Sequence, residues 1–198
     1  MAVNYLAHLS LSRPTVASRV GNVLGDFMRG VDVQALPETV QRALDNHRLV
    51  DRVTDQHPSV RQARALFSPS RRRFAGVAMD VLFDHFLWQH WSRFHDRPLQ
   101  HAIGDYYRQL QQGQALMPPA MQAAVGRMRE RDLLNVYASL EGVSEALDAM
   151  AARIRFTNSF AGIGEELALH YDTLEQVFLA LYPHLDREVT RAAIETPG

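Results

Sequence analysis

The stretch from residue 71 to residue 95 constrains the fold more than any other part of the sequence. On a 3.6-residue helical wheel its apolar side chains occupy nearly the whole circumference, and only a thin polar strip remains near Gln89 and Arg93. A helix that is apolar nearly all round is buried inside a protein. The rest of the sequence shows no alternating pattern typical of strands. We therefore predict an all-α fold, a single-domain helical bundle over residues 1–198, built around one long buried helix at 71–95.

Further helices are predicted from apolar spacing and from the prolines and glycines that interrupt it. Two glycines, Gly21 and Gly25, fall inside one of these helices, where each costs about 1 kcal/mol relative to alanine. Their presence indicates that another backbone or a ligand approaches closely. We expect the further helices at about 3–11, 14–29, 37–56, 58–66, 99–112, 118–134, 139–154 and 163–182.

The composition excludes several classes of function. The sequence contains no cysteine, which excludes thiol catalysis and disulfide bonds. All 21 basic residues are arginine, so catalysis by a Schiff-base or P-loop lysine is excluded as well. A net charge of -1 argues against a dedicated nucleic-acid partner. Because signal-peptide features are lacking and no apolar run approaches the roughly 18 residues of a membrane span, we expect a cytoplasmic protein without a membrane partner.

Two carboxylates, Asp80 and Asp84, lie one turn apart on the apolar surface of the central helix, and His85 is adjacent to them. Burying an ionised carboxylate costs several kcal/mol or more unless it is neutralised, paired with a cation or bound to a metal. Two such carboxylates on one buried helix therefore indicate a functional site.

A second polar set lies on the neighbouring predicted helices. His47 and Asp51 stand four residues apart within the core stripe of the helix at 37–56, which fits either a structural ion pair or part of a ligand set. Asp26 lies on one flank of the preceding helix. His8, in the first short helix, fits either a core histidine bonded to a carbonyl or a site residue.

Inward-facing aspartates and histidines at helical spacing are how helical bundles build metal sites. Imidazole and carboxylate ligands without thiolate suit Mn²⁺, Fe²⁺ or Mg²⁺ better than a structural Zn²⁺. Such an ion polarises a phosphate oxygen and activates a bound water, which is the chemistry of a phosphoester hydrolase. The spacing alone also fits di-iron oxidases and inert ion-pair cores. The candidate catalytic residues are Asp26, His47, Asp51, Asp80, Asp84 and His85.

Five motifs are spread over nearly the whole chain. They are Asn4-Tyr-Leu-Ala-His8-Leu, Gly21-Asn22-x-Leu-x-Asp26-Phe-x-Arg29-Gly30, His47-Arg48-x-x-Asp51-x-x-Thr54-Asp55, Asp80-x-x-x-Asp84-His85-Phe86 with His90-Trp91, and His170-Tyr171-Asp172-x-Leu-Glu175. Jointly they resemble the acyl carrier protein phosphodiesterase family. The resemblance implies hydrolysis of the phosphodiester that joins 4'-phosphopantetheine to a serine of holo-acyl carrier protein, giving the apo-protein, with Mn²⁺ as the usual metal.

That family is held to be distantly related to the HD-domain phosphohydrolases, helical enzymes whose ligands follow a His…His-Asp…Asp pattern. Here the adjacent pair is reversed, as Asp84-His85. We interpret the only literal His-Asp pair, His95-Asp96, as a coincidence at a helix end. The order of the ligands stays open.

For this chemistry the residues expected to hold the metal are Asp26, His47, Asp84 and His85. Asp51 and Asp80 then orient ligands or bind a second ion. The residues expected to bind substrate are Asn22, His8, Arg29 and Arg48. The two arginines suit bidentate contact with a phosphodiester.

Acyl carrier proteins are small and acidic, so a productive complex needs positive charge near the site. The candidate docking residues are Arg61, Arg64, Arg71, Arg72 and Arg73. Ordinary solvating charges are the alternative, and the next candidates are Arg127, Arg129 and Arg131. Two other functions stay open, a phosphohydrolase of a nucleotide or other small phosphoester and a non-enzymatic helical binding module.

Overall fold

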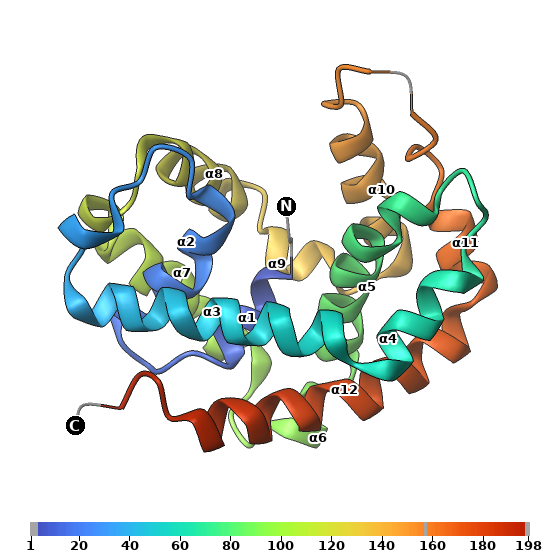
Figure 1. Ribbon diagram of the computed structural model, residues 1–198. Coiled ribbons are helices and arrows are strands. Elements are labelled where there is room, and N and C mark those ends of the chain that lie inside the picture. The colour runs from blue at the N-terminus through green and yellow to red at the C-terminus, as the bar shows by residue number, and fades with distance from the viewer. Residues whose placement is uncertain (1–3, 157, 197–198) are drawn as a thin grey trace.

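The computed structural model describes residues 4–156 and 158–196. Every regular element in these ranges is a helix, with twelve α-helices and five short 3-10 helices, which confirms the predicted all-α fold (Figure 1). None of the described helices combines the length and the hydropathy that crossing a membrane requires.

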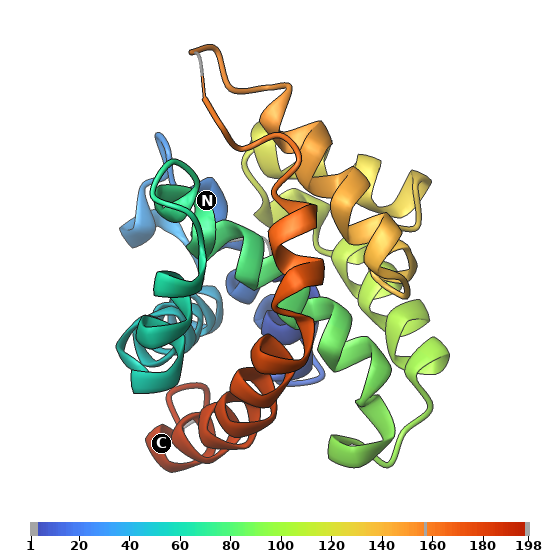
Figure 2. The same ribbon diagram turned by 90° about the vertical axis from the view of Figure 1, so that its right-hand side faces the viewer.

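Helix α5 (Ala75–Gln89) lies at the centre of the molecule, as its apolar wheel predicts (Figure 2). It contacts α1 (Tyr5–Ser10), α10 (Leu140–Ala151), α11 (Gly164–Leu169) and α12 (Tyr171–Ala192). Because neighbours surround α5, its middle turns are buried on nearly every side.

The prediction of one continuous helix at 71–95 is wrong at both ends. A 3-10 turn, η4 (Arg72–Phe74), precedes α5, and α5 ends before the short helix α6 (Trp91–Phe94). His90, between α5 and α6, leaves helical backbone geometry, and its Nε2 lies 2.8 Å from Oε1 of Glu175 on α12. Tertiary contacts of this kind override helix propensity, which is a weak preference.

Helices α2 (Val16–Leu24) and α3 (Glu38–Gln56) pack against each other along most of their length. A Cβ atom on Gly21 would lie 2.6 Å from the carbonyl oxygen of Val40 and would overlap the Cβ of Ala43. The close backbone approach predicted from the helical glycines is therefore confirmed. Helix α7 (Leu99–Gln112) also packs against α2.

Several of the other predicted helices differ from the structure, and the one expected at 58–66 ends at Ala63 before the 3-10 turn η3 (Arg64–Leu66). The helix expected at 14–29 stops at Leu24 and continues as the 3-10 turn η1 (Gly25–Phe27). The helix expected at 118–134 divides into α8 (Pro119–Glu130) and α9 (Leu133–Val136). The division occurs because Asp132 takes a left-handed conformation, with φ of 47°.

The C-terminal helix expected at 163–182 divides at His170 into α11 and α12, and α12 continues through Pro183 to Ala192. A proline inside a helix costs about 3 kcal/mol. Beyond the proline, Leu185 is buried and Val189 packs against the core, and this apolar burial offsets the cost. Helix α12 also contacts α3 and α4 (Pro58–Ala63).

Gly21→Ala should lower the free energy of unfolding by about 1–3 kcal/mol, because the added methyl group forces α2 away from α3. Gly104→Ala is the matched control. A Cβ on Gly104, in α7, would meet no heavy atom within 4 Å, so this substitution should raise stability by up to about 1 kcal/mol through helix propensity. Urea unfolding monitored by circular dichroism measures both variants. Equal effects would contradict the close approach of α2 and α3.

Candidate metal centre

Two histidines and one aspartate converge beside α1 and α3. Nε2 of His8 lies 3.1 Å from Oδ1 of Asp51, and Nε2 of His47 lies 3.1 Å from Oδ2 of the same carboxylate. The two imidazole rings stack with their centroids 4.1 Å apart. Within the described part of the chain, this is the only group of three or more histidine or acidic side chains whose potential ligand atoms lie within 4.8 Å of one another.

The neighbouring helix α2 fixes the orientation of His47. Nδ1 of His47 donates a hydrogen bond to the backbone carbonyl of Asn22, at 2.8 Å, so in the neutral ring the lone pair is on Nε2 and faces Asp51. A Cβ atom on Gly25 would overlap the His47 ring, which explains the glycine at that position. A histidine that donates one ring N–H to a carbonyl while its other nitrogen faces a carboxylate is typical of a metal ligand.

The surroundings of His8 also indicate whether a metal ion fits this group. The His8 side chain is buried, Nδ1 has no hydrogen-bond partner among the described residues, and Nε2 lies 3.1 Å from Oδ1 of Asp51 without the alignment of a regular hydrogen bond. Burial, and secondarily the neighbouring His47, lower the pKa of His8 to about 4. The ring is therefore neutral at pH 7, and its contact with Asp51 is not an ion pair. An unpaired buried nitrogen is costly, and a divalent ion between the imidazoles and the carboxylate would remove that cost. The residues present fit such an ion.

The pKa shifts of the residues in this group are those expected of a site that binds a cation. Burial tends to raise the pKa of Asp51, but the two imidazoles outweigh it and hold that pKa below its usual range. Burial lowers the pKa of His47, but Asp51 and then Asp26 reverse the effect, so the net shift is upward. Asp51 is the open side of the group, because its side chain is 38% exposed whereas those of His8 and His47 are 1% and 3% exposed.

Asp80 lies on α5 and faces the same acidic region. Burial is the main cause that raises the pKa of Asp80 to about 7, and the negative charges of Asp51, Asp55 and Asp26 raise it further, while Arg64 opposes them. Three of the predicted catalytic carboxylates therefore interact electrostatically, although they come from three different elements.

Asp84 has a different role in the fold. Its carboxylate accepts hydrogen bonds from the backbone amides of Leu6, at 2.8 Å, and Ala7, at 2.9 Å. These amides belong to the first turn of α1, where no intrahelical partner exists. Burial raises the pKa of Asp84 well above its usual value, with the two amide donors acting in the opposite direction. Asp84 anchors α1 to α5 and thereby positions His8.

His85 points away from the other candidate ligands. Its Nδ1 donates to the carbonyl of Tyr137 and its Nε2 accepts from the hydroxyl of Tyr171, both at 2.8 Å. Successive helical residues are about 100° apart, and here Asp84 faces the amides of α1 whereas His85 faces Tyr137 and Tyr171. The predicted ligand set is therefore not assembled in the structure, which groups His47 with His8 and Asp51.

The predicted substrate-binding residues are also differently placed. The Asn22 amide donates to the carbonyl of Ser18 and to Oε1 of Glu195, and its Oδ1 accepts from Asn46, so its side chain is occupied by the fold. Arg48 pairs with Asp45 at 2.9 Å on the exposed side of α3. Arg29 is exposed, three residues after Asp26.

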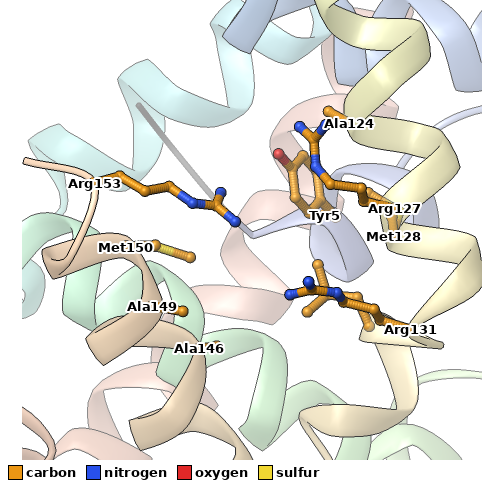
Figure 3. Close-up of a pocket in the computed structure, with 10 residues that line it drawn as sticks. Tyr5, Ala124, Arg127, Met128, Arg131, Ala146, Ala149, Met150 and Arg153 are labelled. Carbon is orange, nitrogen blue, oxygen red and sulfur yellow. The ribbon is translucent and has the colours of Figure 1, made fainter.

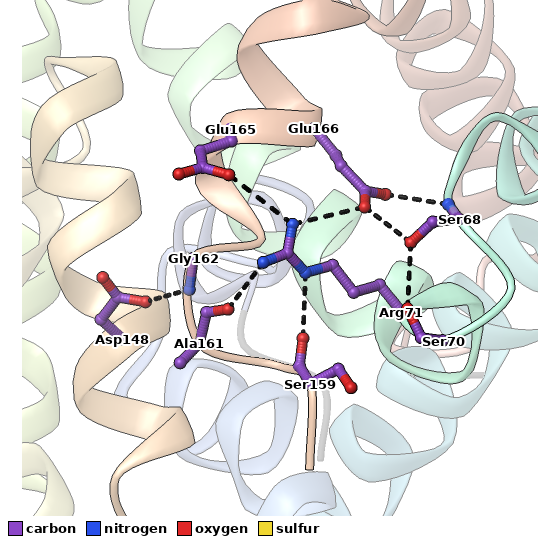
Figure 4. A network of polar contacts seen from close by, with 9 residues as sticks. All are labelled: Ser68, Ser70, Arg71, Asp148, Ser159, Ala161, Gly162, Glu165 and Glu166. Atoms are coloured by element: carbon purple, nitrogen blue, oxygen red, sulfur yellow. Dashed lines mark hydrogen bonds and ion pairs between the residues drawn. The ribbon is translucent and has the colours of Figure 1, made fainter.

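Most of the predicted docking arginines serve the fold. Arg71 donates from Nε to the carbonyl of Ser159 and from Nη2 to that of Ala161, each at 3.0 Å, and its Nη1 lies 3.4 Å from Oε1 of Glu166 (Figure 4). Arg64 pairs with Asp55. Arg72 donates to the carbonyl of Phe67 and Arg73 lies over the Phe74 ring, but both are exposed, as is Arg61.

Sequence reasoning missed two supporting residues. Asn46 and Glu195 hold Asn22, whose carbonyl orients the His47 ring, and Gly25, where a close approach was predicted, accommodates that ring. The glycine within a helical pattern was a usable signal for close approach. Nothing in the local sequence connects Glu195 to Asn22, because the two residues meet only through tertiary folding.

Asp84→Ala should lower the free energy of unfolding by about 2–5 kcal/mol, because two buried amides of α1 lose their acceptor. Asp45→Ala removes an exposed pair and should change stability by less than about 1 kcal/mol. Urea unfolding of both variants without metal makes the comparison. A stable Asp84→Ala protein that had lost only metal binding would instead identify Asp84 as a ligand.

Asp80→Asn should stabilise the metal-free protein more at high pH than at low pH. Because the folded-state pKa of Asp80 is raised to about 7, the folded protein retains a proton that the unfolded chain releases. The free energy of unfolding of the wild type therefore falls as the pH rises from the usual aspartate pKa of about 4 to the folded-state pKa of about 7. The asparagine variant has no proton to lose at this position and should not show this fall. Melting temperatures of both proteins in chelator, from about pH 4 to 8, measure this. A difference that does not change with pH would refute the assigned pKa.

Comparisons with known proteins identify the same family that the five motifs indicate. A family model described as acyl carrier protein phosphodiesterase matches residues 3–185. A curated protein of that name from Escherichia coli is 33% identical over 193 residues, which cover 97% of this chain and 100% of that protein. Proteins of the same name from Salmonella newport and Salmonella agona match to the same extent. No solved structure matches the chain. The predicted phosphodiesterase is thus confirmed, and the chain belongs to the acyl carrier protein phosphodiesterase family.

Proposed function

We propose that this protein is a metal-dependent phosphodiesterase that removes 4'-phosphopantetheine from holo-acyl carrier protein and leaves the apo-protein. The observation that supports it most directly is the convergence of His8, His47 and Asp51, with a neutral buried imidazole that has no other partner. Family membership supplies the substrate class. We name Mn²⁺ as the expected ion, with Mg²⁺ or Fe²⁺ as alternatives, because the ligands are imidazole and carboxylate.

Different residues of the chain have different roles around that ion. His8, His47 and Asp51 would hold it, and when bound it supplies a Lewis acid and an activated water. The carbonyl of Asn22 keeps Nε2 of His47 directed at the site. The half-exposed Asp51 leaves the group open on the side from which a protein-bound phosphodiester must approach.

Breaking the bond between phosphorus and the serine oxygen requires a proton for the departing oxygen. Asp80, whose pKa is raised to about 7, retains a proton near neutral pH and lies in the same acidic region, so we assign it this role. Arg29, exposed after the turn that carries Asp26, is the better placed of the two predicted phosphate-binding arginines, because Arg48 is paired with Asp45.

Mass spectrometry of holo-acyl carrier protein before and after incubation tests the proposal. With Mn²⁺ the wild type should convert the holo-form to the apo-form and release phosphopantetheine, and chelator should stop the reaction. His47→Ala and Asp51→Ala should each lower turnover at least about 100-fold, because each removes a ligand of the ion. They should also abolish the increase in melting temperature that Mn²⁺ gives the wild type.

His101→Ala is the matched control, because His101 is an exposed histidine on α7 outside the group, and it should change neither measurement. Release of phosphate from small phosphoesters without conversion of the carrier would favour the alternative phosphohydrolase. A His47→Ala protein with full turnover and an intact Mn²⁺ response would refute the proposed centre.

A further inference from the structure

A pocket lies between α8, the end of α10 and the first residue of α1 (Figure 3). Its volume is about 170 Å³. Met128, Leu133 and Met150 give it an apolar interior. Three guanidinium groups reach it, those of Arg127 and Arg131 from the end of α8 and that of Arg153 from the segment after α10.

These three arginines differ from the arginines near the start of α5. All three are exposed, and among the residues that the structure describes no side-chain hydrogen bond or ion pair engages them. Arg71 and Arg64, by contrast, are held by Glu166 and Asp55. Unpaired positive charges that converge on a concave surface attract anions. The concentration is local, because the whole chain carries a net charge of -1.

Tyr5 connects this pocket with the candidate metal centre. Its ring lines the pocket, and it precedes His8 by less than one turn on α1. Burial is the main cause that raises the pKa of Tyr5, Asp26 raises it further, and Arg127 and Arg153 oppose the shift. The phenol therefore experiences both the Asp26 carboxylate and the arginines of the pocket.

We infer that this pocket is the docking site for the acidic surface of the carrier protein, with carboxylates contacting Arg127, Arg131 and Arg153 and one apolar side chain entering the pocket. The inference rests on the proposed function and assigns docking to residues outside the 61–73 segment. Charge complementarity supports an acidic protein partner, because the three unpaired guanidinium groups border an apolar pocket, which suits a surface that carries carboxylates around one apolar side chain. The apolar volume has room for a single side chain such as leucine.

Charge reversal tests the docking site. The triple variant Arg127→Glu, Arg131→Glu and Arg153→Glu should raise KM for holo-acyl carrier protein at least about tenfold and leave kcat within about twofold, because docking precedes chemistry. Its KM should also depend less on salt than that of the wild type. Hydrolysis of bis(p-nitrophenyl) phosphate with Mn²⁺ should stay unchanged. Arg129→Glu, on an exposed position of α8 that does not line the pocket, is the matched control and should leave KM unchanged.

The possible results separate this inference from the proposed function. If the wild type fails to convert the carrier, the function itself is refuted. If the wild type converts it and the folded triple variant retains the wild-type KM, the docking site is refuted while the function stands. An equal loss on the carrier and the small diester would place the arginines in the chemistry and would also overturn docking. Circular dichroism checks that the triple variant is folded. The triple Arg→Gln variant, which removes the positive charges without adding negative ones, should show a smaller rise in KM.

Discussion

The contact between the Asp84 carboxylate and the first amides of α1 is the interaction on which the rest of the site depends. Helix α1 has six residues, which is too short for stability in isolation. Its orphan amides find their acceptor on α5, the central helix. The carboxylate is costly to bury, but it fixes the position and direction of α1. His8, the residue after Ala7, is thereby held beside His47.

The second constraint is the close approach of α2 and α3. Gly21 lets the two backbones meet, and Gly25 leaves room for the His47 ring. The same approach brings the Asn22 carbonyl to Nδ1 of His47 and so determines which ring nitrogen faces Asp51. The chemistry of the centre is therefore a consequence of helix packing, because each ligand is directed by a neighbour on a different helix.

Charge is segregated in this nearly neutral chain. The negative charges of Asp51 and Asp26 raise the cost of ionising Asp80, whereas the two imidazoles favour the ionised form of Asp51. Three arginines that have no ion pair among the described residues line the pocket to which Tyr5 also contributes. This arrangement suits a substrate that is both a phosphodiester and an acidic protein, since a cation site and a positive rim can contact its two anionic parts at once.

Periodicity and composition by themselves determined the all-α fold, the buried central helix, the shared face of His47 and Asp51 and the close approach at Gly21. These features follow from residues a few positions apart, whose geometry the helix fixes. Only the tertiary structure decided that Asp84 faces α1 while His85 faces Tyr137 and Tyr171, and that Arg71 is tied to the 159–166 segment. A helical pattern shows which side chains share a face. Which distant segment meets that face depends on the packing of the whole chain.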